Sequence, residues 1–261
     1  MSRPIAVIPS RYAAVRFPGK PLTPLLGKPM VQHVWERCTE AKCFEQVIVA
    51  TDDLRIAAVV KGFGGLAVMT SEHCASGSDR VAEVARGMGV GDEQVFFNVQ
   101  GDEPAIHPES LTILAKAFAD DAAGSVQMGT LIRPLADDER PNSNVVKVVL
   151  DATQHALYFS RADIPHQRDL TQPSPPRWAH LGIYAYRKAT LLRVASLAPT
   201  ALERAESLEQ LRALAHGVRI TCRVTPHGSV SVDRPEDLPA AEAALRKLLS
   251  PPPGQRATVP V

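Results

Sequence analysis

A short apolar run at residues 95–99 ends abruptly in the polar segment 100–103, and this change constrains the fold more than any other feature of the chain. Phe and Val suit a strand that is covered on both faces, as in a parallel sheet. Ligands of open α/β sheets bind beyond the carboxyl ends of such strands. Asp102 is therefore a candidate metal ligand, and Gly101 allows the backbone to approach a ligand closely. The alternative is that the carboxylates only cap a helix after Pro108.

Strand and helix patterns alternate along the chain, which predicts an α/β fold. Right-handed crossovers make the sheet mostly parallel, with helices on both faces. Polar residues at strand positions predict a small second sheet lobe, within about residues 133–215, that supplies a binding wall. We expect one domain over residues 1–250 and a flexible tail at 251–261. Strands are expected at residues 5–8, 47–50, 66–69, 95–99, 124–132, 145–150, 180–186 and 229–232, and helices include 108–118, 188–194 and 206–216.

Composition excludes several classes of protein. The 29 Lys and Arg residues balance 28 Asp and Glu residues, so the net charge of +1 argues against nucleic-acid or membrane partners bound by bulk charge. No segment approaches the roughly 20 apolar residues of a membrane span. Four scattered cysteines lack zinc-site spacing and suit a reducing compartment. We expect a cytoplasmic protein.

A basic loop follows the first strand, at residues 10–21, and carries Arg11, Arg16 and Lys20. Such a loop is where an α/β protein binds phosphate, since Arg grips phosphate oxygens with its planar fork and Lys acts as a point charge. Neither G-x-x-x-x-G-K-[ST] nor G-x-G-x-x-G occurs, which argues against a P-loop ATPase and a nicotinamide dehydrogenase. An ordinary solvated loop remains the alternative.

The segment Asn98-Val99-Gln100-Gly101-Asp102-Glu103-Pro104 resembles the signature of the 3-deoxy-manno-octulosonate (Kdo) cytidylyltransferases, or CMP-Kdo synthetases. The basic loop is similar to the R-x(4)-R-x-P-G-K-P loop of sugar nucleotidyltransferases. The resemblance extends from Ile5 to about Leu249 and includes the segments 76–80, 146–149, 156–161, 180–184, 207–212 and 233–238. It implies a Rossmann-like nucleotidyltransferase sheet, CMP transfer from CTP to the anomeric hydroxyl of Kdo with release of pyrophosphate for lipopolysaccharide biosynthesis, and a homodimer.

The resemblance also implies the role of each site residue. Carboxylates matching Asp102 and Asp233 hold Mg²⁺ in the family, and with Lys20 and Arg16 they would form the catalytic set. Whether one or two ions act stays open. The residues implied to contact the nucleotide are Arg11, Arg16, Lys20, Ser76, Gly77, Ser78, Arg80 and Gln100. Those implied to contact the acid sugar are Gln100, Arg161, His180, Tyr184, Glu209 and Gln210.

Three departures from the family pattern occur. Ser78 replaces a Thr, Cys74 stands where the family has a His, and Arg234 replaces the Thr after Asp233. The first two affect the shape of the base pocket, and the third affects helix capping more than metal binding. A proline-rich segment at 163–178 is of a kind that often closes over a site. Alternative functions are CMP transfer to another acid sugar, such as a sialic acid or an amino-substituted Kdo, a non-catalytic nucleotide-binding module, or a Rossmann oxidoreductase.

Overall fold

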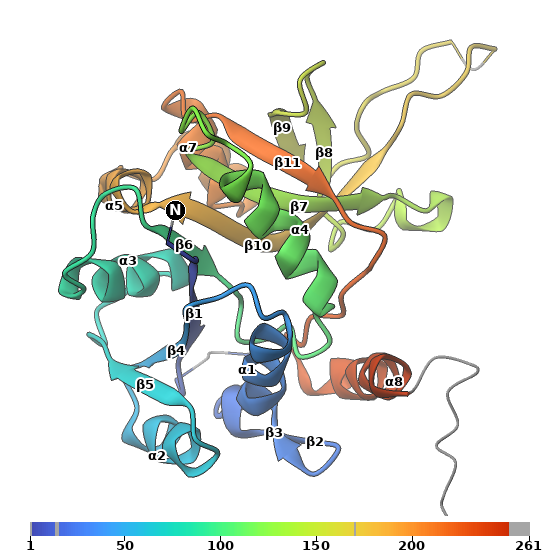
Figure 1. Cartoon of the computed structure of the whole chain (residues 1–261). Helices are drawn as coiled ribbons and strands as arrows, with labels where there is room; N and C mark the ends of the chain where they lie inside the picture. The colour runs from blue at the N-terminus through green and yellow to red at the C-terminus, as the bar shows by residue number, and fades with distance from the viewer. Residues whose placement is uncertain (1, 14–15, 170, 251–261) are drawn as a thin grey trace, which may run out of the picture.

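The computed structural model describes residues 2–13, 16–169 and 171–250. Its centre is a nine-stranded sheet (Figure 1). All strands of the main path run parallel except β10, which is antiparallel to both of its neighbours, β6 and β7. The order across the sheet is β11 (Ile220–Val224), β7 (Met128–Pro134), β10 (Trp178–Arg187), β6 (Val95–Asn98), β1 (Ile5–Ser10), β4 (Gln46–Thr51) and β5 (Leu66–Met69).

Helices cover both faces of the sheet because the central strands are apolar on both sides. Along β1, Ala6 and Ile8 pack into one core with Phe97, whereas Ile5 and Val7 pack into the other. This alternation is the two-residue period of a strand buried on both faces. The first core lies under α1 (Met30–Glu40), α2 (Leu54–Gly62) and α4 (Pro108–Ala119), and the second under α3 (Gly77–Gly87), α5 (Lys188–Ser196) and α7 (Gln210–Ala215).

The chain changes direction across the sheet at β1. It passes through α1 to β4 on one side of β1, and later returns through α3 to β6 on the other side. Helices α1 and α4, which follow β1 and β6, lie on one face of the sheet, whereas α3, which leads into β6, lies on the other face. Such a switch point leaves a crevice at the end of the strands, and ligands of α/β proteins bind there.

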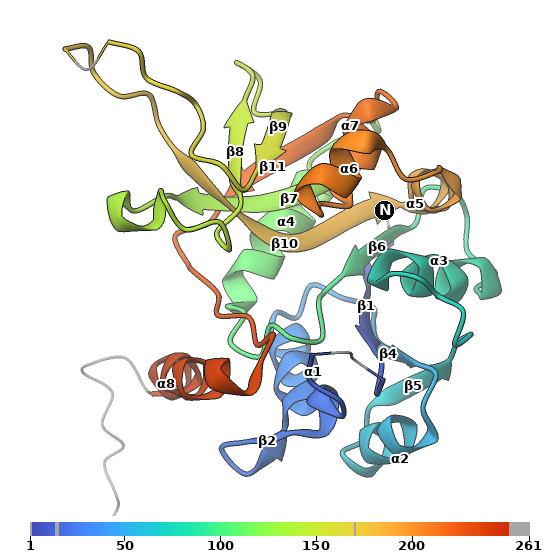
Figure 2. The same ribbon diagram turned by 180° about the vertical axis from the view of Figure 1, so that it is seen from behind.

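The predicted fold class is confirmed, with one difference in the smaller lobe. Strands β8 (Lys147–Leu150) and β9 (Ala156–Ser160) pair with each other, and β8 also pairs with β10, so they branch from the main sheet. The separate two-stranded sheet consists of β2 (Pro24–Leu25) and β3 (Lys28–Pro29). In Figure 2 the branch and α6 (Ala201–Glu206) lie together at one end of the sheet.

Two predicted elements are wrong. Residues 229–232 are not a strand, because β11 takes the outer position beside β7, and Val232 N instead donates a hydrogen bond to Asp102 O (2.9 Å). The helix predicted at 206–216 is interrupted, since α6 ends at Glu206 and Ser207 adopts a left-handed conformation (φ 53°) before α7 begins.

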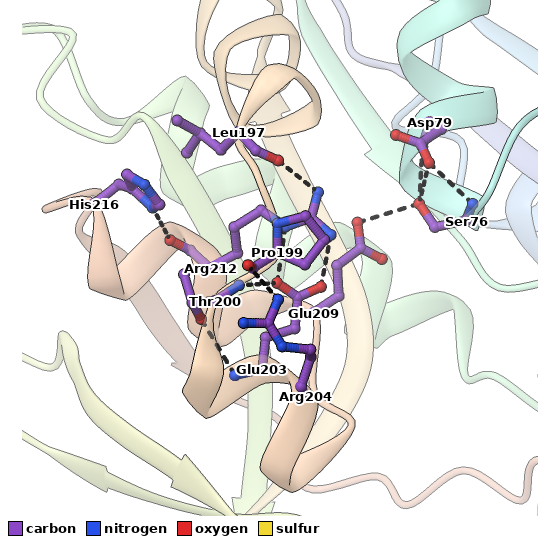
Figure 3. A network of polar contacts seen from close by, with 10 residues as sticks. All are labelled: Ser76, Asp79, Leu197, Pro199, Thr200, Glu203, Arg204, Glu209, Arg212 and His216. Carbon is purple, nitrogen blue, oxygen red and sulfur yellow. Dashed lines mark hydrogen bonds and ion pairs between the residues drawn. The ribbon is translucent and has the colours of Figure 1, made fainter.

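A buried ion pair holds α6 against α7 (Figure 3). Arg212 Nη2 lies 2.6 Å from Glu203 Oε1, and Arg212 Nε lies 2.9 Å from Glu203 Oε2. The Thr200 hydroxyl caps α6 by accepting a hydrogen bond from the backbone nitrogen of Glu203 (3.2 Å). The broken helix is therefore a fixed hairpin, which orients Ser207 and Gln210.

The proline-rich segment does not cover the crevice. Its described residues project from the end of β10 away from the body in both views (Figures 1 and 2). The expected lid is therefore not observed in this structure. The predicted tail at 251–261 lies outside the described residues. Among the residues described, no helix is long and apolar enough to cross a membrane.

Candidate active site

A cavity of about 280 Å³ lies at the carboxyl ends of β1 and β6. The basic loop after β1 forms one wall, the start of α3 forms another, and the segment after β6 closes the base. Seven of the eight predicted nucleotide residues line it, and these are Arg11, Arg16, Lys20, Ser76, Gly77, Arg80 and Gln100. The topology of the sheet thus brings together predicted nucleotide residues that are up to 89 positions apart in the chain.

Two carboxylates in this cavity converge on one ammonium group. Lys20 Nζ lies 2.8 Å from Asp102 Oδ2 and 3.8 Å from Asp233 Oδ1. It also donates to Val232 O (2.8 Å). Arg16 approaches from the exposed side, with Nη2 3.7 Å from Asp233 Oδ1. The side chains predicted as the catalytic set are therefore adjacent.

The segment before Asp233 is tied to the segment after β6. The backbones join where Val232 N donates to Asp102 O, and the Ser229 hydroxyl donates to the Glu103 carboxylate. Burial and then the nearby Asp102 carboxylate raise the pKa of Glu103 to about 7. These contacts fix Asp233 beside Asp102 although no strand ladder links the two segments.

The lack of a side chain at Gly101 allows the end of β1 to pack closely against this residue, in addition to the approach of any ligand. A Cβ at this position would lie 2.8 Å from Pro9 O and 2.9 Å from Ser10 Oγ, distances that real Cβ atoms do not reach. The close approach predicted for this glycine is thus to the end of β1. Any side chain here would separate β1 from β6 and widen the crevice.

The loop before α3 is a capped helix start that opens into the cavity. Ser76 Oγ accepts a hydrogen bond from Asp79 N (3.1 Å), and Asp79 Oδ2 accepts from Ser76 N (3.0 Å), which forms a capping box. Ser78 lies behind the cavity, where its hydroxyl accepts from Asn98 Nδ2 (3.2 Å). Arg80 is buried and pairs with Asp52 (2.9 Å). Ser78 and Arg80 therefore shape the loop, and Ser76 and Gly77 form its exposed edge.

A second cavity, of about 940 Å³, adjoins the first. Arg16, Gln100 and Asp233 line both cavities, so the two cavities meet at Asp233 and the basic loop. Of the six predicted sugar residues, five line the larger cavity, and these are Gln100, Arg161, His180, Tyr184 and Gln210.

The sixth, Glu209, points to the nucleotide side instead. Ser76 Oγ donates to Glu209 Oε1 (3.3 Å), as Figure 3 shows. Burial raises the pKa of Glu209. Glu209 therefore links α7, on the wall of the larger cavity, to the start of α3 in the smaller one.

Two polar side chains of the larger cavity have unused hydrogen-bonding or charge capacity. Gln210 is 6% exposed, and its Nε2 has no hydrogen-bond partner among the described residues. The Arg161 guanidinium is held by the carbonyls of Glu206 (2.8 Å) and Ser143 (2.9 Å), rather than by a carboxylate. Buried polar groups without partners are rare, so Gln210 can donate to a polar ligand, and Arg161 has positive charge available for an anion.

His180 stands between the sheet and the larger cavity. It lies 3.0 Å from Thr130 Oγ1 and packs at an angle against the rings of Phe159 and Tyr184. Burial lowers its pKa to about 3, so the ring is neutral at physiological pH. It can therefore exchange hydrogen bonds with hydroxyl groups but supplies no positive charge to an anion.

This shift predicts a measurable pH dependence of stability. Between pH 6.5 and 5 the unfolded chain protonates His180 while the folded chain does not, so protonation favours unfolding and stability falls as the pH falls. In His180→Gln the fall in the free energy of unfolding between pH 6.5 and pH 5 should be smaller by about 1 kcal/mol. This figure is lower than the full pKa shift would give, because the ring is partly exposed to solvent. Urea unfolding of both proteins at pH 6.5 and pH 5 measures the difference. If the free energy of unfolding fell equally in the two proteins, His180 would not be neutral in the folded chain over this pH range.

The donor set fits a hard divalent cation. Two carboxylate oxygens, from Asp102 and Asp233, lie within 4 Å of one nitrogen, and no Cys or His side chain joins them in the lining of the smaller cavity except Cys74 on its far loop. Mg²⁺ takes oxygen ligands, and it keeps few from protein when phosphate and water supply the others. The ammonium of Lys20 shows that this point already stabilises positive charge.

Sequence reasoning missed several residues of the larger cavity. Glu103 was considered only as a helix cap, yet it lines the cavity together with Arg133, Asn144 and Ser229. The position of Glu103 beside Asp102 could have indicated its role. No local pattern could have indicated Arg133 or Asn144, because β10 and the branch bring them to the cavity.

Known proteins resemble this chain along most of its length. A family model described as cytidylyltransferase matches residues 5–220. A 3-deoxy-manno-octulosonate cytidylyltransferase of Myxococcus xanthus is 55% identical over 245 residues, which are 94% of this chain and 97% of that protein. The chain belongs to the 3-deoxy-manno-octulosonate cytidylyltransferase family. A family member from Geobacter sulfurreducens is 47% identical over 255 residues, covering 93% of this chain and 98% of that protein.

The fold of the family is also confirmed by solved structures. A CMP:2-keto-3-deoxy-manno-octonic acid synthetase complexed with CTP has a TM-score of 0.87 and 39% sequence identity, and the match covers 95% of this chain and all of that one. A 4-diphosphocytidyl-2C-methyl-D-erythritol synthase, 13% identical with a TM-score of 0.62, shares the fold alone. The resemblance predicted from the separated motifs is therefore confirmed at the level of family and fold.

Proposed function

We propose that the chain transfers CMP from CTP to the anomeric hydroxyl of Kdo and releases pyrophosphate. The observation that supports this most is the junction of two cavities at Arg16, Gln100 and Asp233. One cavity has cations and a capped helix start, which suit a triphosphate and a base. The other has polar groups that suit a hydroxylated acid. Transfer between two substrates requires such adjoining sites.

The smaller cavity would hold CTP. Arg11, Arg16 and Lys20 neutralise the triphosphate and the charge that develops on departing pyrophosphate. Ser76 and Gly77 offer a hydroxyl and backbone groups to the edge of the base. Asp102 and Asp233 would hold Mg²⁺, which when bound withdraws charge from the phosphates and orients them.

The larger cavity would hold the acid sugar. Arg161 pairs with its carboxylate, and Gln210, Tyr184 and neutral His180 bind hydroxyl groups. Gln100, which lines both cavities, positions the anomeric hydroxyl toward the α-phosphate. That oxygen forms the new bond to phosphorus as the bond to pyrophosphate breaks, and the hydroxyl proton passes to solvent, so no covalent enzyme intermediate is needed.

Arg161 gives a prediction specific to the sugar. We expect Arg161→Met to lower kcat/KM for Kdo about 10- to 100-fold with little change in the KM for CTP, because a charge-assisted hydrogen bond to the substrate is lost. Steady-state rates with each substrate varied in turn measure this. Arg140→Met is the matched control, since Arg140 pairs with Asp163 (2.8 Å) outside both cavities. Equal losses for both substrates would contradict the assignment of Arg161 to the sugar.

Release of pyrophosphate from CTP and Mg²⁺ tests the function. It is measured with Kdo, an amino-substituted Kdo and a sialic acid, and with UTP or ATP in place of CTP. Release only with CTP and Kdo is expected. Release with a different acid sugar would keep the chemistry and overturn the sugar assignment, and no release from folded protein would favour a non-catalytic module.

We further infer, from the family resemblance, a cytoplasmic homodimer that acts in lipopolysaccharide biosynthesis. Light scattering over a dilution series is expected to give twice the chain mass of 28.2 kDa. A mass that stays at the monomer value would contradict the dimer without affecting the proposed chemistry.

A further inference from the structure

Lys20 has two assignments that conflict. As a member of the basic loop it is expected to bind the triphosphate, yet its ammonium already contacts Asp102 (2.8 Å), Val232 O (2.8 Å) and Asp233 (3.8 Å). Only 14% of its side chain is exposed, so it lies between the carboxylates rather than in the open cavity. Two of the three donors of the ammonium are used by Asp102 and Val232 O, so phosphate must compete with the two carboxylates for this nitrogen.

The position also conflicts with a divalent cation at the carboxylates. A cation that binds oxygens of Asp102 and Asp233 would lie close to Lys20 Nζ, where the two positive charges repel each other. Without either cation, the two carboxylates and nearby Glu103 would repel one another. The carboxylates therefore favour a positive charge between them, and a divalent cation would compete with Lys20 for that position.

We propose that Lys20 is an exchangeable counter-ion for the metal carboxylates. Before the nucleotide binds, its ammonium holds Asp102 and Asp233 together and weakens the binding of a free divalent cation. When CTP enters, the phosphates draw the ammonium toward themselves, and the carboxylates become available to the cation that accompanies the nucleotide. The inference rests on the proposed function, because it needs the triphosphate in the smaller cavity.

The local structure permits this movement. Lys20 begins a short 3₁₀ helix, η1 (Lys20–Leu22), whose backbone is fixed by Gly19 N donating to Tyr12 O (2.9 Å) and Leu22 N donating to Gly19 O (2.9 Å). The four-carbon side chain can swing while the backbone stays in place. Arg11 and Arg16 line the same cavity and attract the phosphates to this point. Exchange thus requires a change of side-chain rotamer rather than a rearrangement of the loop.

Binding of Mn²⁺, as a probe for the divalent site, tests the proposal without reference to turnover. Free Mn²⁺ is measured by electron paramagnetic resonance with and without CTP, for the wild type and for Lys20→Gln, Lys20→Arg and Lys28→Gln. Lys28 is the matched control because it pairs with Glu36 (2.7 Å) and lines neither cavity. Circular dichroism confirms that each variant is folded, and CTP binding is measured separately.

The wild type, Lys20→Arg and Lys28→Gln are expected to bind Mn²⁺ weakly until CTP is added. Lys20→Gln should bind Mn²⁺ alone about tenfold more tightly than the wild type, since an opposing charge is removed. Weaker Mn²⁺ binding by Lys20→Gln would overturn the proposal and make Lys20 a support for the site. If Lys20→Arg bound Mn²⁺ as tightly as Lys20→Gln does, the proposal would also be overturned, because loss of the positive charge would not be the cause of the tighter binding.

The proposed function and the exchange of Lys20 would be refuted by different results. A wild-type protein that neither binds CTP nor releases pyrophosphate would refute the proposed function. A wild-type protein that binds and turns over CTP, with a Lys20→Gln variant whose Mn²⁺ affinity is unchanged, would refute only the exchange of Lys20.

Discussion

Replacing Asp102 by Asn is expected to lower the rate of CMP transfer about 10³-fold or more while the protein stays folded. The substitution keeps the size of the side chain and removes its negative charge, so the carboxylate oxygen that faces Lys20 can no longer support a divalent cation. The backbone hydrogen bond from Val232 N to Asp102 O does not depend on the side chain. Pyrophosphate release under saturating CTP and Kdo measures the loss, and urea unfolding measures the stability.

The control for Asp102 is a carboxylate that lies outside the site. Asp138 is exposed, in the 3₁₀ helix η2 (Asp137–Glu139), and lines neither cavity. Asp138→Asn is expected to retain the wild-type rate. If Asp102→Asn also retained a rate close to wild type, Asp102 would not be a metal ligand in the reaction.

The largest effect on stability is expected at Arg187, the last residue of β10. Its side chain is 2% exposed, and it lies 2.8 Å from Glu93, 3.2 Å from Asp121 and 2.9 Å from Val126 O. Arg187→Met leaves the Asp121 carboxylate, itself 8% exposed, without its cation. Breaking a buried pair by removing one partner costs about 3–5 kcal/mol, and we expect a loss near the lower end because Glu93 remains solvated.

Arg246→Met is the matched control for Arg187. Arg246 pairs with Glu242 at 3.7 Å on the surface of α8 (Leu238–Leu249), where its side chain is 68% exposed. An exposed pair contributes at most about 1 kcal/mol. The free energy of unfolding, from urea titrations of both variants at one pH, is the measured quantity. Losses of similar size in the two variants would show that burial of Arg187 does not decide its contribution.

Much of the fold could be predicted because, in the first half of the chain, the local sequence patterns agree with the observed strands and helices. The strands near 5–8, 47–50, 66–69 and 95–99 are short apolar runs, and the helices between them have regular apolar spacing. The position of the site beyond the carboxyl ends of parallel strands followed from these elements and from the handedness of crossovers. Local pattern and tertiary structure agree here, as in a sequence with little frustration.

The second half was harder because long-range pairing decides its structure. Residues 229–232 have the alternation of a strand, but β11 already occupies the edge beside β7, so the segment forms isolated hydrogen bonds to the residues after β6. The Arg212–Glu203 ion pair joins the two helices across the break at Ser207, and no period in the sequence reveals this contact. Tertiary contacts override the local pattern in both cases.

The candidate active site likewise contains residues that local motifs could predict and residues that only long-range contacts position. Charged residues of the segments that follow β1 and β6, such as Lys20 and Asp102, could be predicted because these motifs come after the carboxyl ends of the strands. The hydroxyl of Ser78 could not be placed, since it bonds to Asn98 behind the cavity. The orientation of Glu209 toward Ser76 likewise depends on how α7 packs against α3.

The most direct test of CMP transfer to Kdo is phosphorus NMR of a reaction that contains the protein, CTP, Mg²⁺ and Kdo labelled with ¹³C at its anomeric carbon. The three CTP signals are expected to give way to pyrophosphate and one phosphodiester signal that is coupled to the labelled carbon. Pyrophosphate together with free CMP, and no coupling to the anomeric carbon, would contradict transfer to the sugar.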